Sequence, residues 1–418
     1  MGTVLDGMQR RTFLAASTLV VAGSVAGCLT EQSTGTPADD DAGAEPDAGD
    51  QAGDDQVSVD QAGGDGPSQF QADPQNTGVV GGGAPDDVRV DWQTGISPID
   101  GGLSIVDGRL VVVGGGEATV LDAADGTEQW TRRVGHDTEA PPALSADTAY
   151  VTAWNGGAQQ DRGVAALALD DGEERWRAVP DVDVNTAPTL ADGTVFVGGS
   201  LNSRAVIAID AATGDEHWRF EAGQYATTPA VADGTVFVGG GKEHVAYALS
   251  ATDGAELWRF ETDGRVWGAP TVRDGTVYVG SRSGHVYALD AANGEERWRT
   301  HVGAEIPSSI AATAEQLLVS TRESVVALDT AGERQWSVDV VSGAHPPLVT
   351  TDRVVVADGR TAYCLDAASG DTLWSREGTE QASGDAVYAG IDCAPIVADG
   401  RVYVASHGGD VHALGPVG

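Results

Sequence analysis

A glycine placed four residues before a tryptophan recurs along this chain. The pairs are Gly126/Trp130, Gly172/Trp176, Gly214/Trp218, Gly254/Trp258, Gly294/Trp298, Gly332/Trp336 and Gly370/Trp374. Their tryptophans are 38 to 46 residues apart, and Trp92 lies 38 residues before Trp130. A period near 40 in a chain rich in strand-forming residues is typical of a propeller with one four-stranded blade per repeat. The repeat therefore predicts an all-β fold.

One repeat, from residue 269 to 300, shows how a blade is expected to form. Short runs of β-forming residues alternate with turn residues, which predicts strands at Ala269–Val272, Thr276–Gly280, His285–Asp290 and Glu295–Thr300. The first two are joined by an Asp-Gly pair, which favours a tight hairpin because glycine tolerates positive φ. The same pair recurs at Asp107-Gly108, Asp192-Gly193, Asp233-Gly234 and Asp399-Gly400.

Two further repeated positions have structural explanations. An aspartate precedes the turn before each tryptophan strand, where its carboxylate is expected to accept backbone N–H bonds: Asp122, Asp170, Asp210, Asp290, Asp329 and Asp366. A fixed turn then places each indole at the same height, where it packs between blades. We therefore assign a structural role and no ligand role to Trp92, Trp130, Trp176, Trp218, Trp258, Trp298, Trp336 and Trp374.

The repeats also predict how the ring closes. Seven complete repeats end at Trp374, and the partial repeat Ala394–Leu414 has three strands without a tryptophan strand. The missing strand is present near the other end of the sequence, at Val88–Trp92. We expect an eight-bladed β-propeller of four-stranded antiparallel blades, closed by this N-terminal strand in the last blade. Such closure removes strand edges that would invite aggregation.

The N-terminal part predicts export and anchoring. Residues 1–28 contain Arg10-Arg11 and an apolar run ending at Cys28, which together are typical of a twin-arginine signal peptide with a lipobox. The alternative is a chance cysteine after an apolar run. Residues 29–67 carry no Lys or Arg and cannot bury a core, so they are predicted to be a disordered acidic linker. Residues 68–418 are predicted to be the propeller, with 69–78 packed on it.

Charge and cysteine content narrow the functional classes. The net charge is −39, with 63 acidic and 24 basic residues and Lys242 as the single lysine. Such a composition resembles that of proteins from extremely halophilic archaea. In molar salt the Debye length is about 3 Å, so the repulsion between the many carboxylates of the chain is screened. An ordinary acidic secreted protein is the alternative. Nucleic acid is an unsuitable partner for so acidic a chain.

Cys364 and Cys393 are expected to be buried thiols, with a disulfide as the alternative.

A functional site is expected at the central funnel, where residues enter each innermost strand. These positions vary chemically while the rest of the repeat is monotonous: His136, Glu139, Asn185, Tyr225, Arg265, Trp267, Glu305, His345 and Asp392. They could form a tailored binding surface, or they could be solvated loops free to drift. Trp267 could stack on a ligand or simply pack. His136 and His345 could ligate a metal, but no spacing supplies a third ligand, so no metal site is assigned.

The motif Ala-x-Asp-x-x-x-Gly-x-x-x-Trp, at Ala208–Trp218 and Ala288–Trp298, resembles the pyrroloquinoline-quinone-type (PQQ-type) propeller repeat from about Gln69 to the end. This resemblance implies either a quinoprotein dehydrogenase, which holds the quinone and Ca²⁺ at the ring centre, or a non-enzymatic propeller lipoprotein similar to the scaffold of outer-membrane barrel assembly. The bare blades and the absence of vicinal cysteines favour the lipoprotein.

Three functions follow as hypotheses. The preferred one is a non-catalytic propeller, monomeric and lipid-anchored through Cys28 on the extracytoplasmic face of the cell membrane, that binds an envelope protein or polymer without a cofactor. The alternative is a sugar or alcohol dehydrogenase dependent on PQQ and Ca²⁺. A sensor ectodomain is the third and would need a separate signalling partner.

Overall fold

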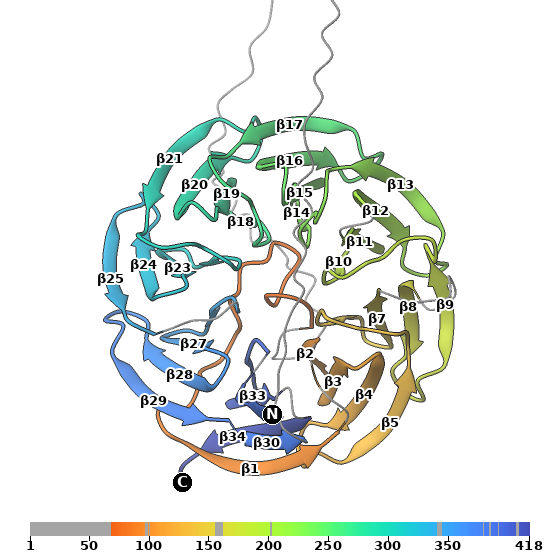
Figure 1. The fold of residues 1–418 in the computed structure, drawn as a ribbon, viewed down its shortest axis with the longest axis vertical. Helices are drawn as coiled ribbons and strands as arrows, with labels where there is room; N and C mark the ends of the chain where they lie inside the picture. The colour runs from red at the N-terminus through yellow and green to blue at the C-terminus, as the bar shows by residue number, and fades with distance from the viewer. Residues whose placement is uncertain are drawn as a thin grey trace, which may run out of the picture. The chain divides into compact units, whose positions relative to one another are not determined.

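The computed structural model describes residues 68–96, 99, 101–154, 162–200, 203–340, 345–378, 380–383, 386–391, 393–406 and 409–418. Within them, eight four-stranded antiparallel sheets are arranged as the blades of a ring, which confirms the predicted fold (Figure 1). The predicted signal peptide, Cys28, the linker and most of an insertion in blade 2 lie outside the described residues. None of the described segments forms a helix long and apolar enough to cross a membrane.

Each blade runs from an innermost to an outermost strand in chain order, and the last blade receives its outermost strand from the start of the propeller. Blade 1 consists of β2(Gly102–Val106), β3(Arg109–Gly114), β4(Glu117–Asp122) and β5(Glu128–Arg133). Blade 2 consists of β6(Ala143–Leu144), β7(Thr148–Ala153), β8(Gly163–Ala168) and β9(Glu174–Ala178). Blade 3 consists of β10(Thr189–Ala191), β11(Thr194–Gly198), β12(Ala205–Asp210) and β13(Glu216–Glu221), and blade 4 of β14(Ala230–Ala232), β15(Thr235–Gly239), β16(Val245–Ser250) and β17(Glu256–Glu261). Blade 5 consists of β18(Thr271–Arg273), β19(Thr276–Gly280), β20(His285–Asp290) and β21(Glu296–His301), and blade 6 of β22(Ala311–Ala312), β23(Gln316–Ser320), β24(Val325–Asp329) and β25(Arg334–Val338). Blade 7 consists of β26(Leu348–Val349), β27(Arg353–Ala357), β28(Thr361–Asp366) and β29(Thr372–Glu377). Blade 8 consists of β32(Ile396–Ala398), β33(Arg401–Ala405), β34(Asp410–Pro416) and β1(Val88–Gly95).

The turns within a blade form as their residues predict. Asp274 and Gly275 have φ of 48° and 66°, so both central residues of the β18–β19 hairpin are left-handed, as a type I′ turn requires. At the next turn, Asp290 Oδ1 accepts bonds from the N–H groups of Ala292 and Asn293 at 3.0 and 3.3 Å. Asp170 differs from the prediction, because its carboxylate pairs with the Arg109 guanidinium at 2.7 Å.

The glycine and tryptophan of the repeat meet across the boundaries between blades. Each of the eight clusters of buried apolar residues includes or contacts one repeat tryptophan. In blade 4, Trp258 is 8% exposed and its Nε1–H donates to the Ala291 carbonyl of blade 5 at 2.9 Å. A Cβ on Gly294 of blade 5 would lie 2.7 Å from the Trp258 ring. The repeat tryptophans therefore pack at the boundaries between blades.

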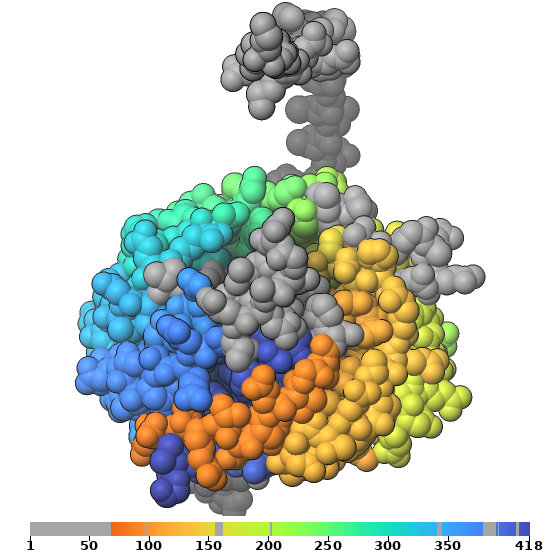
Figure 2. Space-filling view, turned by 60° about the horizontal axis from the view of Figure 1, so that its bottom comes forward, coloured from red at the N-terminus to blue at the C-terminus, as the bar shows by residue number. Residues whose placement is uncertain are grey.

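Ring closure also follows the prediction. β1 pairs antiparallel with β34, with Trp92 opposite Ala413. Figure 2 shows the orange N-terminal segment running along the surface between the blue last blades and the first blade. Blade 8 has no turn of its own to receive Trp374, so that indole donates instead to the Pro85 carbonyl, at 2.8 Å. The segment leading into β1 therefore completes the boundary between blades 7 and 8.

The residues before β1 cross the centre of the ring (Figure 1). Their carbonyls accept bonds from equivalent N–H groups on the innermost strands of blades 2, 4, 5, 6 and 7: Leu144, Val231, Val272, Ala312 and Val349 bond to Ser68, Pro74, Gln75, Thr77 and Gly78. In blade 3 the Leu190 N–H donates to Gln69 Oε1 at 2.8 Å. We call residues 68–80 the central segment. In each of six blades it accepts a hydrogen bond from an N–H group at the inner edge of the sheet. Without this segment, water would have to bond to these N–H groups.

One element was not predicted. A short hairpin, β30(Glu380–Ser383) paired with β31(Ala386–Ala389), stands between β29 and β32 outside the repeat.

Candidate functional site

A cup of about 550 Å³ opens at the end of the ring where the innermost strands begin. All eight blades contribute lining residues, and Gln69, Phe70 and Gln71 of the central segment complete the lining. The hydrogen bonds of the central segment reach residues further along the same innermost strands. The segment therefore forms the floor of the cup.

The structure brings together five of the nine residues predicted for the funnel. Glu139, Asn185, Tyr225, Trp267 and His345 line the cup. His136, Arg265 and Glu305 lie outside its lining, on the loops around it, and Asp392 falls outside the described residues. His136 is exposed, with its Nδ1 3.4 Å from Asp137 Oδ2.

Two aromatic rings dominate one side of the rim. Trp267 is 44% exposed, and its ring stacks on Tyr225 with centroids 5.9 Å apart and an interplanar angle of 27°. The eight repeat tryptophans, by contrast, each donate an indole N–H to a neighbouring carbonyl. Trp267 thus leaves nearly half of its surface exposed to solvent at the mouth of a cavity, as an anchor at a binding surface does.

Two cations flank these rings, and a third pairs with a carboxylate beside them; none of the three was predicted as a site residue. Lys242 Nζ lies 4.8 Å from the Tyr225 centroid, and Arg282 Cζ lies 4.8 Å from the Trp267 centroid. Arg322 Nε lies 3.3 Å from Glu305 Oε2, and the Arg282 guanidinium also pairs with Glu305. The Arg282 hydrogen bond is the main cause that lowers the pKa of Glu305 below its usual value. We call Lys242, Tyr225, Trp267, Arg282, Glu305 and Arg322 the cation–aromatic ladder.

A shared position in the repeat supplies these cations. Each follows the second strand of its blade, and its N–H donates to the loop that enters that blade: Lys242 to Gln224, Arg282 to Arg265 and Arg322 to Glu305. Blades 4, 5 and 6 thus carry a basic residue at one equivalent turn. Alignment of the repeats shows a basic residue at the same turn in three successive blades, and this signal could have identified these residues.

The ladder rests on a constrained backbone. Tyr225 has a φ of 58°, which is rare for a bulky residue. Gly241 accommodates it, because a Cβ there would lie 2.1 Å from the Tyr225 carbonyl oxygen. Such conformations persist only where the surroundings enforce them, and they cluster at functional sites.

The described lining offers few ligands for the Ca²⁺ that the dehydrogenase alternative implies. Glu139 is the one carboxylate among the described lining residues. Across the described chain, no group of three or more His, Cys, Asp or Glu side chains is placed to hold a metal ion. We therefore derive no reaction step through these cofactors.

The two cysteines belong to the structural core. No disulfide joins them, and they lie in separate apolar clusters, Cys364 between blades 7 and 8 and Cys393 between blades 8 and 1. Burial raises the pKa of Cys364 to about 12, so its thiolate is not accessible near neutral pH.

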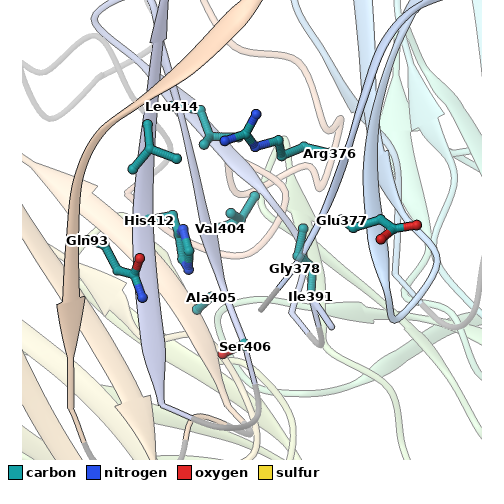
Figure 3. A pocket seen from close by; sticks show the side chains of 11 residues that line it. Gln93, Arg376, Glu377, Gly378, Ile391, Val404, Ala405, Ser406, His412 and Leu414 are labelled. Carbon is teal, nitrogen blue, oxygen red and sulfur yellow. The ribbon is translucent and has the colours of Figure 1, made fainter. Parts of the chain in front are cut away.

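A second cavity, of about 170 Å³, lies beside the ring closure. In Figure 3 the His412 ring on β34 lies between Gln93 on β1 and Val404 on β33, while the Glu377 carboxylate points away. His412 is buried and its Nε2 has no hydrogen-bond partner. Burial lowers the pKa of His412, so the ring is a neutral part of the closure.

Known proteins share this architecture. The family model described as outer membrane protein assembly factor BamB matches residues 76–200, 157–228, 202–322 and 321–415. The serine/threonine-protein kinase AfsK of Streptomyces coelicolor is 35% identical over 130 residues, which are 30% of this chain. The match spans only 15% of the kinase.

Solved structures agree in fold. BamB from Moraxella catarrhalis superimposes with a TM-score of 0.65 at 17% identity, covering 79% of this chain and 98% of that one. Quinohemoprotein alcohol dehydrogenase from Comamonas testosteroni gives 0.66 at 15% identity, covering 84% and 80%. Since the family model covers most of the sequence, this chain belongs to the family described as outer membrane protein assembly factor BamB, a family of PQQ-type β-propellers.

Proposed function

We propose that this protein is a non-catalytic interaction scaffold of the cell envelope and that it binds a protein partner at the mouth of the cup. The observation that carries the proposal is the exposed Trp267, stacked on Tyr225 and flanked by Lys242 and Arg282. Tryptophan, tyrosine and arginine are the residue types enriched where interfaces concentrate their binding energy. The description of the family as an outer membrane protein assembly factor is consistent with this use of the fold. Barrel assembly in an outer membrane is not carried over.

An aromatic photo-crosslinking residue at position 267, which keeps a ring in place of the indole, tests this proposal. Leu257 on the outer strand β17 is the matched control, because it is an exposed apolar side chain (54% exposed) far from the cup in the fold. We expect one envelope protein to crosslink reproducibly from position 267 and not from position 257. Equal labelling from both positions, or none from position 267, would contradict the proposal.

We further propose that the propeller is exported by the twin-arginine route, works as a monomer in molar salt and is held on the extracytoplasmic membrane face by a lipidated Cys28. The twin arginines, the apolar run and the net charge of −39 support these statements. The substitution Cys28→Ser should release the protein into the medium. A Cys28→Ser protein that stays with the membrane would contradict the lipid anchor. A circular dichroism spectrum unchanged between molar salt and dilute buffer would contradict the adaptation to molar salt.

A PQQ- and Ca²⁺-dependent dehydrogenase is the second candidate, because Trp267 borders a cavity in a fold shared with quinohemoprotein alcohol dehydrogenase. Adding the quinone and Ca²⁺ and assaying dye reduction over a panel of sugars and alcohols decides between the two functions. Saturable reduction abolished by Trp267→Ala would replace the scaffold proposal.

A further inference from the structure

We infer that the cation–aromatic ladder binds an acidic polypeptide segment of the partner, one in which carboxylates alternate with apolar or aromatic side chains. This inference rests on the proposed function and specifies the chemistry of the partner at the same site. It depends on four observations: the order of the side chains, their charge, their exposure and the backbone that holds them.

The side chains of blades 4 and 5 follow one another in a fixed order, with a cation at each end and two rings between them. Lys242 covers one end of Tyr225, Tyr225 stacks on Trp267, and Arg282 covers Trp267. A segment lying along this row meets a cation, two aromatic rings and a second cation in turn. Carboxylates match the two ends, and an apolar or aromatic side chain matches the exposed ring of Trp267.

The charge of the ladder is opposite to that of the protein. Its cations are Lys242, Arg282 and Arg322, and Arg265 is exposed on the adjoining loop. Glu305 is the carboxylate that pairs with Arg282 and Arg322, so one negative charge is shared between two guanidinium groups. Lys242 Nζ has a neutral neighbour, Gln224 Oε1 at 3.4 Å.

The nearby carboxylate of Asp263 is already engaged on the side facing β20. Its Oδ2 lies 2.7 Å from His285 Nδ1, and it accepts hydrogen bonds from the Ser281 and Ser283 hydroxyls. In a chain with 63 acidic and 24 basic residues, the clustering of cations in the equivalent turns of three successive blades favours an anionic ligand.

Molar salt suits this mode of binding. A Debye length of about 3 Å removes the long-range repulsion between the protein and an acidic segment. Direct contacts between carboxylates and the ladder cations act at shorter range, and burial of the Trp267 ring does not depend on charge. The ladder can therefore select an acidic segment although the whole protein is strongly acidic.

The test uses the purified propeller in molar KCl and fluorescently labelled synthetic peptides. The probe alternates Glu and Tyr; one control peptide has Gln for each Glu, a second has Ser for each Tyr, and polyphosphate serves as a non-peptide polyanion. We expect saturable binding of the Glu–Tyr probe and at least roughly tenfold weaker binding of each control peptide and of polyphosphate.

Variants locate the binding. Lys242→Gln, Arg282→Gln and Trp267→Ala should each weaken the probe by roughly tenfold or more. Arg259→Gln is the matched control, because Arg259 Cζ lies 5.8 Å from the Tyr247 ring on an outer strand and forms the same kind of pair away from the cup. Binding that survives the ladder variants, or that Arg259→Gln weakens equally, would overturn the inference.

The two proposals fail differently. If position 267 crosslinks a partner whose contact segment is not acidic, and the Glu–Tyr probe does not bind, the scaffold function stands and the acidic-segment inference falls. If polyphosphate binds as well as the probe, the site recognises polyanions in general. If neither crosslinks nor probe binding are found, both proposals fall.

Discussion

The boundaries between blades and the mouth of the cup are built from the same repeats, yet they differ in what they expose. At a boundary, Trp258 is 8% exposed and donates its indole N–H to Ala291. At the mouth, Trp267 is 44% exposed and stacks on Tyr225. Protein covers almost all of Trp258, whereas nearly half of the Trp267 surface is exposed to solvent.

This difference separates stability from recognition along the chain. Residues that recur with the repeat are explained by turns and by packing between blades. Residues at the mouth differ between blades and gather into one ladder on blades 4 to 6. If this division is correct, substitutions at the boundaries should change stability, and substitutions at the mouth should change binding.

The largest effect is expected at a boundary. Trp258→Ala should lower the free energy of unfolding by about 3–5 kcal/mol, because it leaves a large cavity and removes the bond to Ala291. Leu257→Ala, at the exposed neighbouring position on the same strand, should change it by less than about 0.5 kcal/mol. Denaturant titration in molar salt measures both. Similar costs at positions 257 and 258 would mean that the boundaries do not carry the stability.

The central segment joins the two regions and provides a pH-dependent test. Burial raises the pKa of Asp73 to about 6, although Thr77 donates hydrogen bonds to its carboxylate. The folded protein therefore binds this proton more tightly than the unfolded chain, whose pKa is about 3.8. The resulting stability is complete below about pH 4 and is lost as the pH rises through 6.

Asp73→Asn removes that titration. Relative to the unmodified protein, this variant should gain up to about 3 kcal/mol of stability between pH 4 and pH 7. Asn293→Ser, in an exposed turn, is the control; it changes no ionisable group, so its effect should be the same at every pH. A constant offset for Asp73→Asn across this range would show that the central segment does not bury an ionisable carboxyl.

Two glycines sharpen the boundary argument, because their backbones match and their surroundings do not. Gly254 and Gly234 have φ of +70° and +71°, but a Cβ on Gly254 would lie 2.6 Å from Trp218 and one on Gly234 would meet nothing within 4 Å. Gly234→Ala should cost about 1 kcal/mol from backbone strain alone. Gly254→Ala should cost about 1–3 kcal/mol more, because the Trp218 ring must shift. Thermal or denaturant midpoints compare them, and equal losses would mean that contact with tryptophan does not explain the glycine.

The repeats predicted the parts of this structure that side chains encode. Asp-Gly pairs located the hairpins, tryptophans located the boundaries, and Val88–Trp92 located the closing strand. The path of the central segment was not predictable in detail, since backbone carbonyls make most of its bonds to the inner edges and any residue supplies a carbonyl. The ladder was predicted in part, because Tyr225, Trp267 and Glu305 were among the predicted funnel residues. Lys242 and Arg282 are identified as neighbours of the rings, and Arg322 as a neighbour of Glu305, only when the equivalent turns of successive blades are compared.

The smallest expected effect on stability gives the sharpest test of the comparison. Trp267→Ala removes as many atoms as Trp258→Ala, but its ring is nearly half exposed and its main contact is a single stacked partner. Its unfolding free energy should change by no more than about 0.5–1.5 kcal/mol, the worth of one aromatic pair. The same substitution should weaken binding of the Glu–Tyr probe by roughly tenfold or more. A residue that serves recognition need not stabilise the ring. If Trp267→Ala lowered the free energy of unfolding as much as Trp258→Ala does, Trp267 would be a structural residue like the repeat tryptophans, and the comparison would fail.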